Sequence, residues 1–260
     1  MPAPDIAGAR ELIVPRENIY AHTKKLLFLI EQIDEYIKAN GGPITVMDFG
    51  CGNGDAVSQF LIRDDLHYFG VDIHGPSLQY AQSHFSGENV KFVDHAPQGL
   101  FFDIIIYADN LEHLPEPVSV LREHWKWMKK NGVILGAVPN GFGPFEIENR
   151  LSRAMGLSKL LDGAKKFKQR FKPSLSIPTP ELPYNHDSGH LQFFTKSSLL
   201  KTLEMCSFQM KEFRNGSFVG APISERFLQG ERIIKANAAI SDFLPHWAVS
   251  TWYFSARKKG

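Results

Sequence analysis

The apolar positions of the chain first follow the period of a helix and then form short buried runs separated by further helical stretches. Between residues 18 and 40, apolar side chains from Ile19 to Ile37 recur at helical spacing, which predicts an amphipathic helix. Gly41-Gly42-Pro43 ends it, because glycine and proline interrupt helical backbone. The pattern therefore predicts one helix ahead of the main fold.

After residue 43, short apolar runs alternate with stretches of helical spacing. We predict strands at 44–49, 67–73, 90–94, 101–109, 133–139, 208–216 and 247–259. We predict helices at 55–64, 76–85, 117–130, 196–208 and 224–243, with Asn131-Gly132 closing the third. Strands alternating with helices indicate a parallel sheet covered on both faces, so the predicted class is a doubly wound α/β fold.

The alternation stops between residues 141 and 190. An interruption of this length in a compact sheet is usually functional, and we interpret it as a lid over the acceptor site. The predicted organisation is an N-terminal helical segment at 1–43, a cofactor-binding half at 44–140, the insertion at 141–190 and the C-terminal part of the same domain at 191–260.

Composition sets few limits on function. The chain has 29 basic and 28 acidic residues, so its overall charge gives no argument for nucleic-acid or membrane binding. Two cysteines, Cys51 and Cys206, exclude a disulfide framework. The first residues lack the apolar core of a signal peptide, and no run is apolar enough to span a membrane. These features favour a cytoplasmic protein.

The loop after the first predicted strand carries Gly50, Gly52 and Gly54 between the acids Asp48 and Asp55. Such a loop offers free backbone N–H groups to a ligand. The dinucleotide fingerprint requires glycines at its first, third and sixth positions, and the sixth position here is Asp55. A carboxylate is unfavourable beside a pyrophosphate, which argues against a nicotinamide oxidoreductase.

A second acid, Asp72, ends the second predicted strand and lies beside the first loop in this kind of sheet. A carboxylate there can accept both hydroxyls of a ribose. The site thus suits a nucleoside attached to a group with both a carboxylate and positive charge, and S-adenosylmethionine has this chemistry.

The segments DFGCGNGD, GVDIHGPSLQYA, VDHAP and FDIIIYADNLEHL resemble those of class I S-adenosylmethionine-dependent methyltransferases over residues 44–139. The resemblance implies a seven-stranded, mostly parallel sheet with an antiparallel last strand. It also implies cofactor contacts, in which Asp48, Gly50, Cys51, Gly52 and Gly54 hold the methionine end. Asp72 would bind the ribose, Ile73 the adenine face, and Asp94 and His95 the adenine edge, with Asp109 also at the cofactor.

The residues Asp109, Glu112 and His113 follow the fourth predicted strand and would share a face if the chain turned helically. With His190 or His186 they are candidates for a divalent-cation site, for example for Mg²⁺. The arrangement is similar to that of metal-dependent O-methyltransferases, among them small-RNA 2′-O-methyltransferases and ubiquinone-pathway enzymes. Two alternatives remain: His113 or His190 acts as a metal-free general base, or both histidines are structural.

Residues 150–172 are rich in lysine and arginine and carry apolar residues at helical spacing. This segment is interpreted as a lid, a peripheral membrane contact, a contact for an anionic acceptor or a solvated helix. RNA is disfavoured because the rest of the chain is not basic. The predicted function is O-methylation of a small-molecule, glycan or nucleotide-sugar intermediate. The alternatives are an S-adenosylmethionine-binding protein without transfer activity and an RNA 2′-O-methyltransferase.

Overall fold

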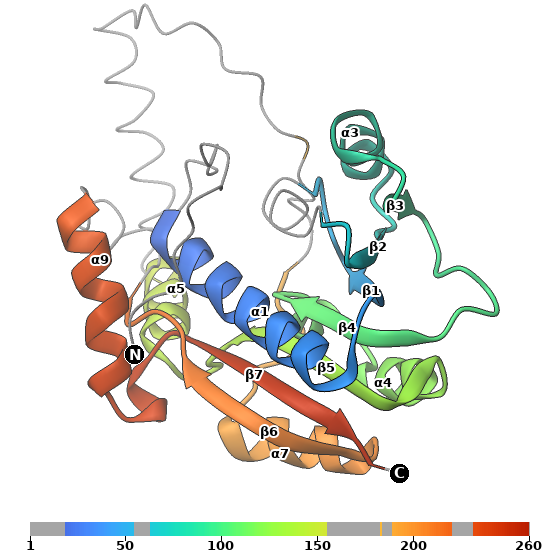
Figure 1. Cartoon of the computed structure of the whole chain (residues 1–260). Helices are drawn as coiled ribbons and strands as arrows, with labels where there is room; N and C mark the ends of the chain where they lie inside the picture. Colours follow the sequence, from blue (N-terminus) through green and yellow to red (C-terminus); the bar gives the residue numbers. More distant parts are fainter. Residues whose placement is uncertain (1–18, 55–62, 155–182, 184–188, 220–230, 260) are drawn as a thin grey trace, which may run out of the picture.

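The computed structural model describes residues 19–54, 63–154, 183, 189–219 and 231–259, which contain a seven-stranded sheet flanked by helices (Figure 1). The strands are β1 Ile44–Phe49, β2 Leu66–Val71, β3 Val90–Val93, β4 Phe102–Ala108, β5 Met128–Pro139, β6 Phe208–Asn215 and β7 Thr251–Lys258. The α-helices are α1 Ile19–Asn40, α3 Gly75–Phe85, α4 Pro117–Lys126, α5 Pro144–Ala154, α7 Lys196–Met205 and α9 Glu231–Ile240. The short 3₁₀ helices are η1 Leu111–His113, η2 Ser241–Phe243 and η3 His246–Ala248.

The strand order is β3-β2-β1-β4-β5-β7-β6. Strand β1 pairs in parallel with both β2 and β4, so the chain leaves the sheet centre in one direction and then in the other. Strand β7 is antiparallel to its neighbours β5 and β6, which confirms the expected doubly wound sheet with an antiparallel last strand. In such sheets ligands bind beyond the carboxyl ends of the strands where the order reverses, here β1 and β4.

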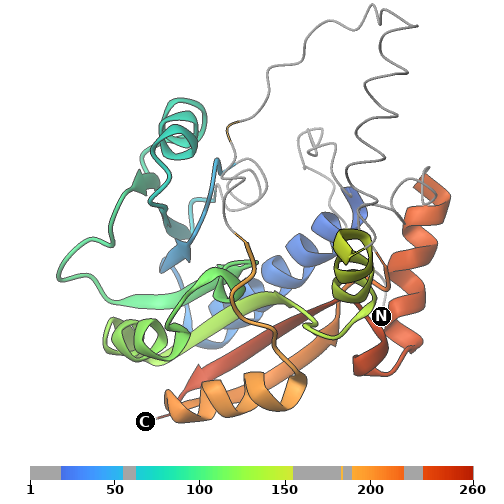
Figure 2. The same ribbon diagram turned by 180° about the vertical axis from the view of Figure 1, so that it is seen from behind.

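Both faces of the sheet are covered, and this explains why strands such as β4 are buried along nearly their whole length. One core includes Leu29 and Ile33 of α1 together with Leu78 of α3. The other includes Leu121 of α4 and Leu203 of α7. Figures 1 and 2 show the two sides, with α1 crossing one face and α4 and α7 visible on the reverse.

The N-terminal half of helix α1 is held by Lys24, whose ammonium group donates hydrogen bonds to several protein oxygen atoms. Lys24 Nζ donates to the carbonyl oxygens of Gly216 (2.9 Å) and Ala238 (2.8 Å) and to Ser241 Oγ (2.8 Å). It also forms an ion pair with Asp242 at 2.6 Å. The predicted N-terminal helix is therefore part of the domain and is joined to α9 and η2.

Two predicted boundaries are wrong. Helix α4 ends at Lys126, and Met128 already pairs with Phe102, so the Asn131-Gly132 pair lies inside β5 and does not close a helix. The pairing register of β4 and β5 shifts between Phe102 and Ile104. This irregularity leaves the extra residues within β5. At the other end, β7 begins only at Thr251, because residues 246–248 form η3.

Several predictions concern residues outside the described part of the chain. They include nearly all of the helix at 55–64, the central part of the insertion at 155–182, His186, and the first part of the helix at 224–243. Of the insertion, α5 at its start, Pro183, and Gly189 and His190 at its end are described.

Helix α7 begins at a capping box, which fixes the end of the segment that carries His190. The Thr195 side chain accepts a hydrogen bond from the Ser198 amide, and the Ser198 side chain accepts one from the Thr195 amide. We expect Thr195→Ala to lower the free energy of unfolding by about 1 kcal/mol, because the Ser198 amide loses its partner. Urea denaturation measures this effect. The exposed Ser197→Ala in the same turn is the control, and equal stability losses in both variants would contradict the assignment.

Candidate active site at the carboxyl ends of β1, β2 and β4

The turn after β1 contains three glycines with left-handed φ values, Gly50 (82°), Gly52 (58°) and Gly54 (72°), and the amides of all three donate to acceptors within the protein. The Gly50 and Cys51 amides both donate to the Val71 carbonyl, at 2.7 and 3.1 Å, which joins the turn to the end of β2. A Cβ atom on Gly50 would lie 1.9 Å from Nδ2 of Asn110, in the segment that follows β4. This position of the turn therefore accepts only glycine.

Asp72 is held against this turn. One carboxylate oxygen accepts from the Gly52 amide at 2.7 Å and the other from the His74 amide at 2.8 Å. A carboxylate has further acceptor positions, so hydroxyl groups of a ligand can still donate to it. Ile73, the next residue, is 91% exposed, which leaves an apolar surface beside the acid.

The other cofactor-site predictions have different environments. Asp94 and His95 are paired with each other and largely exposed at the end of β3. Burial raises the pKa of the Cys51 thiol, so Cys51 is a neutral packing group within the turn. The structure therefore brings together the glycine turn, Asp72 and Ile73, while the two predicted adenine-edge residues lie on the exposed rim.

Asp48 lies beneath the turn and is almost fully buried. Its carboxylate accepts a hydrogen bond from the Tyr68 hydroxyl at 2.8 Å. Burial raises the pKa of Asp48 to about 6, although the Tyr68 hydrogen bond and the charge of Lys25 act in the opposite direction. The acid thus costs stability in the folded protein at neutral pH, which is typical of a functional position.

A buried lysine that the sequence analysis missed lies beside these acids. Lys25 of α1 reaches across to the end of β4, where its Nζ lies 2.5 Å from Asp109 Oδ2. Asp109 has a left-handed backbone (φ 54°), which is uncommon for a residue other than glycine. In sequence, Lys25 looks like any polar residue of an amphipathic helix, and only the packing of α1 over the sheet reveals its place.

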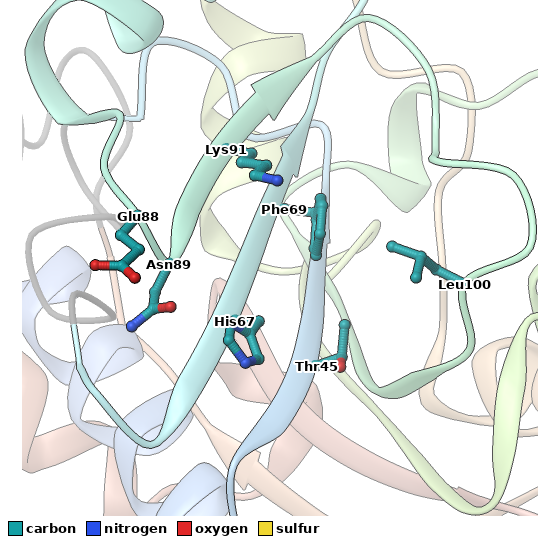
Figure 3. A pocket seen from close by; sticks show the side chains of 7 residues that line it. All are labelled: Thr45, His67, Phe69, Glu88, Asn89, Lys91 and Leu100. Carbon is teal, nitrogen blue, oxygen red and sulfur yellow. The ribbon is translucent and has the colours of Figure 1, made fainter.

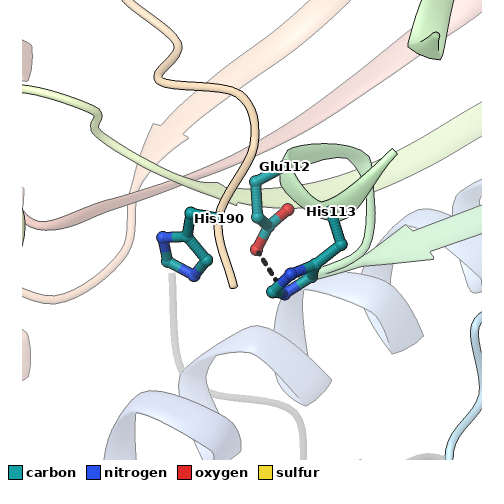
Figure 4. A group of neighbouring side chains, drawn as sticks. All are labelled: Glu112, His113 and His190. Carbon is teal, nitrogen blue, oxygen red and sulfur yellow. Dashed lines mark ion pairs between the residues drawn. The ribbon is translucent and has the colours of Figure 1, made fainter. Parts of the chain in front are cut away.

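Three side chains converge beyond β4, namely Glu112, His113 and His190 (Figure 4). One potential ligand atom from each lies within 4.8 Å of the others. Glu112 Oε1 is 3.9 Å from His113 Nε2, and the two imidazole centroids are 5.0 Å apart. The structure therefore brings His190, at the end of the insertion, beside Glu112 and His113.

Backbone hydrogen bonds place this group. The Glu112 carbonyl accepts from the amides of Leu191 (2.8 Å) and Gln192 (2.9 Å). The Gln192 side chain donates to the carbonyl oxygens of Leu114 and Pro115. His113 Nδ1 is 3.1 Å from the Gly189 carbonyl and donates to it, so Nε2 carries the lone pair facing Glu112.

The electrostatics of the group favour a positively charged ligand. Glu112 is 1% exposed, and its Oε2 atom has no hydrogen-bond partner among the described residues. Burial, and then repulsion from Asp109, raise the pKa of Glu112 well above its usual range. Burial also lowers the pKa of His113, which keeps its imidazole neutral. An unpaired buried carboxyl oxygen and the neutral imidazole of His113 fit a divalent cation.

Two features differ from the prediction. The chain after β4 forms only the 3₁₀ turn η1, so Asp109 does not share a helical face with Glu112 and His113, and its carboxylate pairs with Lys25. A further acid, Glu146 of α5, lies 2.6 Å from His190 Nδ1. Sequence reasoning missed Glu146, because its place depends on how α5 packs after β5.

A cavity of about 160 Å³ lies elsewhere, near the amino ends of β1, β2 and β3 (Figure 3). Thr45, His67, Phe69 and Lys91 are among its lining residues. Residues 94–101, between β3 and β4, contain no helix over this part of the sheet. The cavity is at the opposite end of the strands from the glycine turn and contributes nothing to the candidate active site.

A doubly wound sheet with a glycine turn after β1 and an acid ending β2 defines a nucleoside-cofactor-binding α/β domain. Residues 20–211 match the family described as "Methyltransferase domain", and the chain belongs to this family. The expected relationship to methyltransferases is thereby confirmed. In the described part of the chain, no helix is long and apolar enough to cross a bilayer.

Individual relatives agree with this family. A ubiquinone biosynthesis O-methyltransferase of Pseudomonas fluorescens is 29% identical over 154 residues, which are 56% of this chain and 65% of the relative. The match thus spans less than two thirds of that relative. A SAM-dependent methyltransferase of Methanosarcina mazei is 17% identical, with a TM-score of 0.51 and coverage of 88% and 97% of the two chains. A magnesium protoporphyrin IX methyltransferase from Synechocystis, solved with bound SAH, is 14% identical, with a TM-score of 0.50 and coverage of 91% and 86%.

We expect Asp48→Asn to raise the free energy of unfolding of the cofactor-free protein by about 1–3 kcal/mol near neutral pH. The folded pKa of Asp48, about 6, lies above its unfolded value. The stability gained from its protonation is therefore complete below the unfolded pKa and lost as pH rises through about 6. Asparagine removes the buried charge but still accepts from Tyr68.

Urea denaturation at neutral and at mildly acidic pH measures this gain, which should shrink in acid. Tyr68→Phe is the paired variant, and it should lose stability because Asp48 then has no hydroxyl donor. A stability gain from Asp48→Asn that does not diminish in acid would contradict the assigned cause.

Proposed function

We propose that the chain transfers a methyl group from S-adenosylmethionine to an oxygen atom of a small-molecule or glycan acceptor. The observation that carries this proposal is the meeting of two half-sites at the carboxyl ends of β1 and β4. One half is the glycine turn with Asp72, and the other is the group of Glu112, His113 and His190. The relative from Pseudomonas, an O-methyltransferase by name, supports oxygen as the methyl acceptor.

The cofactor half accounts for each part of the proposed methyl donor. Asp72 accepts the ribose hydroxyls, and the exposed Ile73 packs against the adenine. The Lys25 ammonium faces the carboxylate of the amino-acid end, while Asp48 and Asp109 favour its positive charges. The residues therefore supply both signs of charge that a zwitterionic, sulfonium-bearing ligand needs.

In the acceptor half, Glu112, His113 and His190 supply the ligand atoms for a divalent cation. When bound, such a cation lowers the pKa of an acceptor hydroxyl and orients it. Two imidazoles and one carboxylate fit Mn²⁺, Co²⁺ or Zn²⁺ better than Mg²⁺, which prefers oxygen ligands. Because Asp109 pairs with Lys25, the two carboxylates and two histidines expected from the sequence are reduced to one carboxylate and two histidines.

A second candidate mechanism uses the same residues without a cation. The lowered pKa of His113 leaves its Nε2 unprotonated, so this nitrogen can accept the acceptor proton as a general base. In both mechanisms the chain holds the acceptor oxygen in line with the methyl donor, an orientation effect that accounts for much of the catalysis of such displacements. A cofactor-binding protein without transfer activity would not need this second half-site.

The segment 141–190 is proposed to cover the site. Its described residue Pro183 accepts hydrogen bonds from Asn53 Nδ2 at 3.3 Å and Ser77 Oγ at 3.1 Å, so it lies against the glycine turn and α3. Its last residue, His190, is part of the acceptor half. The two contacts support a lid that spans both half-sites.

We expect Asp72→Ala to weaken S-adenosylmethionine binding by at least about tenfold, because two ribose hydroxyls lose a charged acceptor. Calorimetry on the purified protein measures the affinity, and Asp64→Ala, an exposed acid ahead of β2, is the control. NAD serves as the competing ligand. The cofactor assignment is wrong if the native protein binds NAD and not S-adenosylmethionine.

We expect chelator-treated protein to bind Mn²⁺, and His113→Ala and His190→Ala each to weaken that binding by about tenfold or more. His67→Ala, at the remote cavity, is the control and should bind as the native protein does. Turnover before and after chelation separates the two mechanisms. Full turnover without any bound cation would eliminate the metal-dependent one, and the general-base role fails if both histidine variants retain native turnover.

A further inference from the structure

Glu146 is an acid buried in the first turns of α5, with 4% of its surface exposed. Its Oε1 lies 2.6 Å from His190 Nδ1. Burying a carboxylate costs free energy of folding unless the carboxylate is paired. The carboxylate of Glu146 is paired with His190, a residue of the acceptor half-site. The contact joins the beginning of the 141–190 segment to its end.

The pair determines which nitrogen of His190 is free. A carboxylate oxygen only accepts hydrogen bonds, so Nδ1 carries the proton and donates it to Glu146. In the neutral imidazole Nε2 then has the lone pair. One potential ligand atom of His190 lies within 4.8 Å of one each from Glu112 and His113, and in Figure 4 one ring nitrogen of His190 lies on the side of the ring away from them. The tautomer that leaves Nε2 free is the one that the acceptor half-site needs, whether as ligand or as base.

Helix α5 is itself held firmly at its start. Asn140 Nδ2 donates to the carbonyl oxygens of Trp247 (3.1 Å) and Val249 (2.8 Å), and Asn140 Oδ1 accepts from the Phe142 amide. The Phe145 amide donates to Ser250 Oγ at 3.1 Å. Glu146 follows directly, so its carboxylate is presented from a backbone tied to the loop before β7.

We propose that Glu146 is a positioning residue of the acceptor half-site. It fixes His190 as the Nδ1–H tautomer and aims Nε2 at Glu112 and His113. The proposal rests on the proposed function for the use made of Nε2, but the tautomer itself is a property of the chain alone. Carboxylate partners of this kind orient ligating histidines, and their removal typically costs 10–100-fold in metal affinity.

The first test observes the tautomer in protein free of cofactor and metal. Nitrogen-15 NMR of the imidazole groups at alkaline pH, with His190→Asn used to assign the signals, should show His190 as Nδ1–H. Glu146→Ala should shift His190 toward the Nε2–H form that free imidazole side chains prefer. Glu146→Gln should keep the native tautomer, because its carbonyl oxygen still accepts from Nδ1. An unchanged tautomer in Glu146→Ala would overturn the proposal.

The second test measures Mn²⁺ affinity by calorimetry. Glu146→Ala should lose about 10–100-fold, Glu146→Gln less, and Glu148→Gln, which removes a carboxylate from the same helix, should match the native protein. Thermal denaturation verifies that all variants are folded. Native affinity in a folded Glu146→Ala overturns the proposal. If the native protein binds no Mn²⁺, the metal-dependent function fails, and the tautomer measurement alone decides the role of Glu146.

Discussion

The candidate active site depends on the carbonyl oxygen of Glu112, which accepts hydrogen bonds from two successive amides, those of Leu191 and Gln192. These bonds attach the segment that leads into α7 to the turn after β4. Together with the hydrogen bond from His113 Nδ1 to the Gly189 carbonyl, they hold His190 beside His113, although the two histidines come from distant parts of the sequence. A backbone contact suits this role, because it fixes position whatever side chains the two segments carry.

Around this contact the chain retains charges that a protein built only for stability would avoid. Asp48 and Glu112 are buried with raised pKa values, and Glu112 has an oxygen without a described partner. Lys25 supplies a compensating charge to both acids and pairs with Asp109. The acidic side chains here outnumber the one lysine, as is expected of a site that a cationic ligand completes. Such an arrangement lowers the stability of the ligand-free protein and favours ligand binding.

The fold and the cofactor half could be predicted because their signals are local. Strand β1 runs from Ile44 to Phe49 as the apolar pattern indicates, and the glycines and Asp72 follow their strands directly. The end of α4 could not, because the pairing of Met128 with Phe102 overrides a helical pattern. Lys25 and Glu146 were missed for the same reason: each is an ordinary polar residue of an amphipathic helix until tertiary packing gives it a partner.

The two half-sites therefore differ in how the chain specifies them. The cofactor half is built from the turns that directly follow the consecutive strands β1 and β2. The acceptor half combines η1, the segment before α7 and, through Glu146, helix α5 at the start of the 141–190 insertion. Because α5 holds the partner of His190, a change in the insertion that moves α5 also moves an acceptor-site nitrogen. The described residues of the insertion thus supply both His190 and the carboxylate of Glu146 that is paired with it.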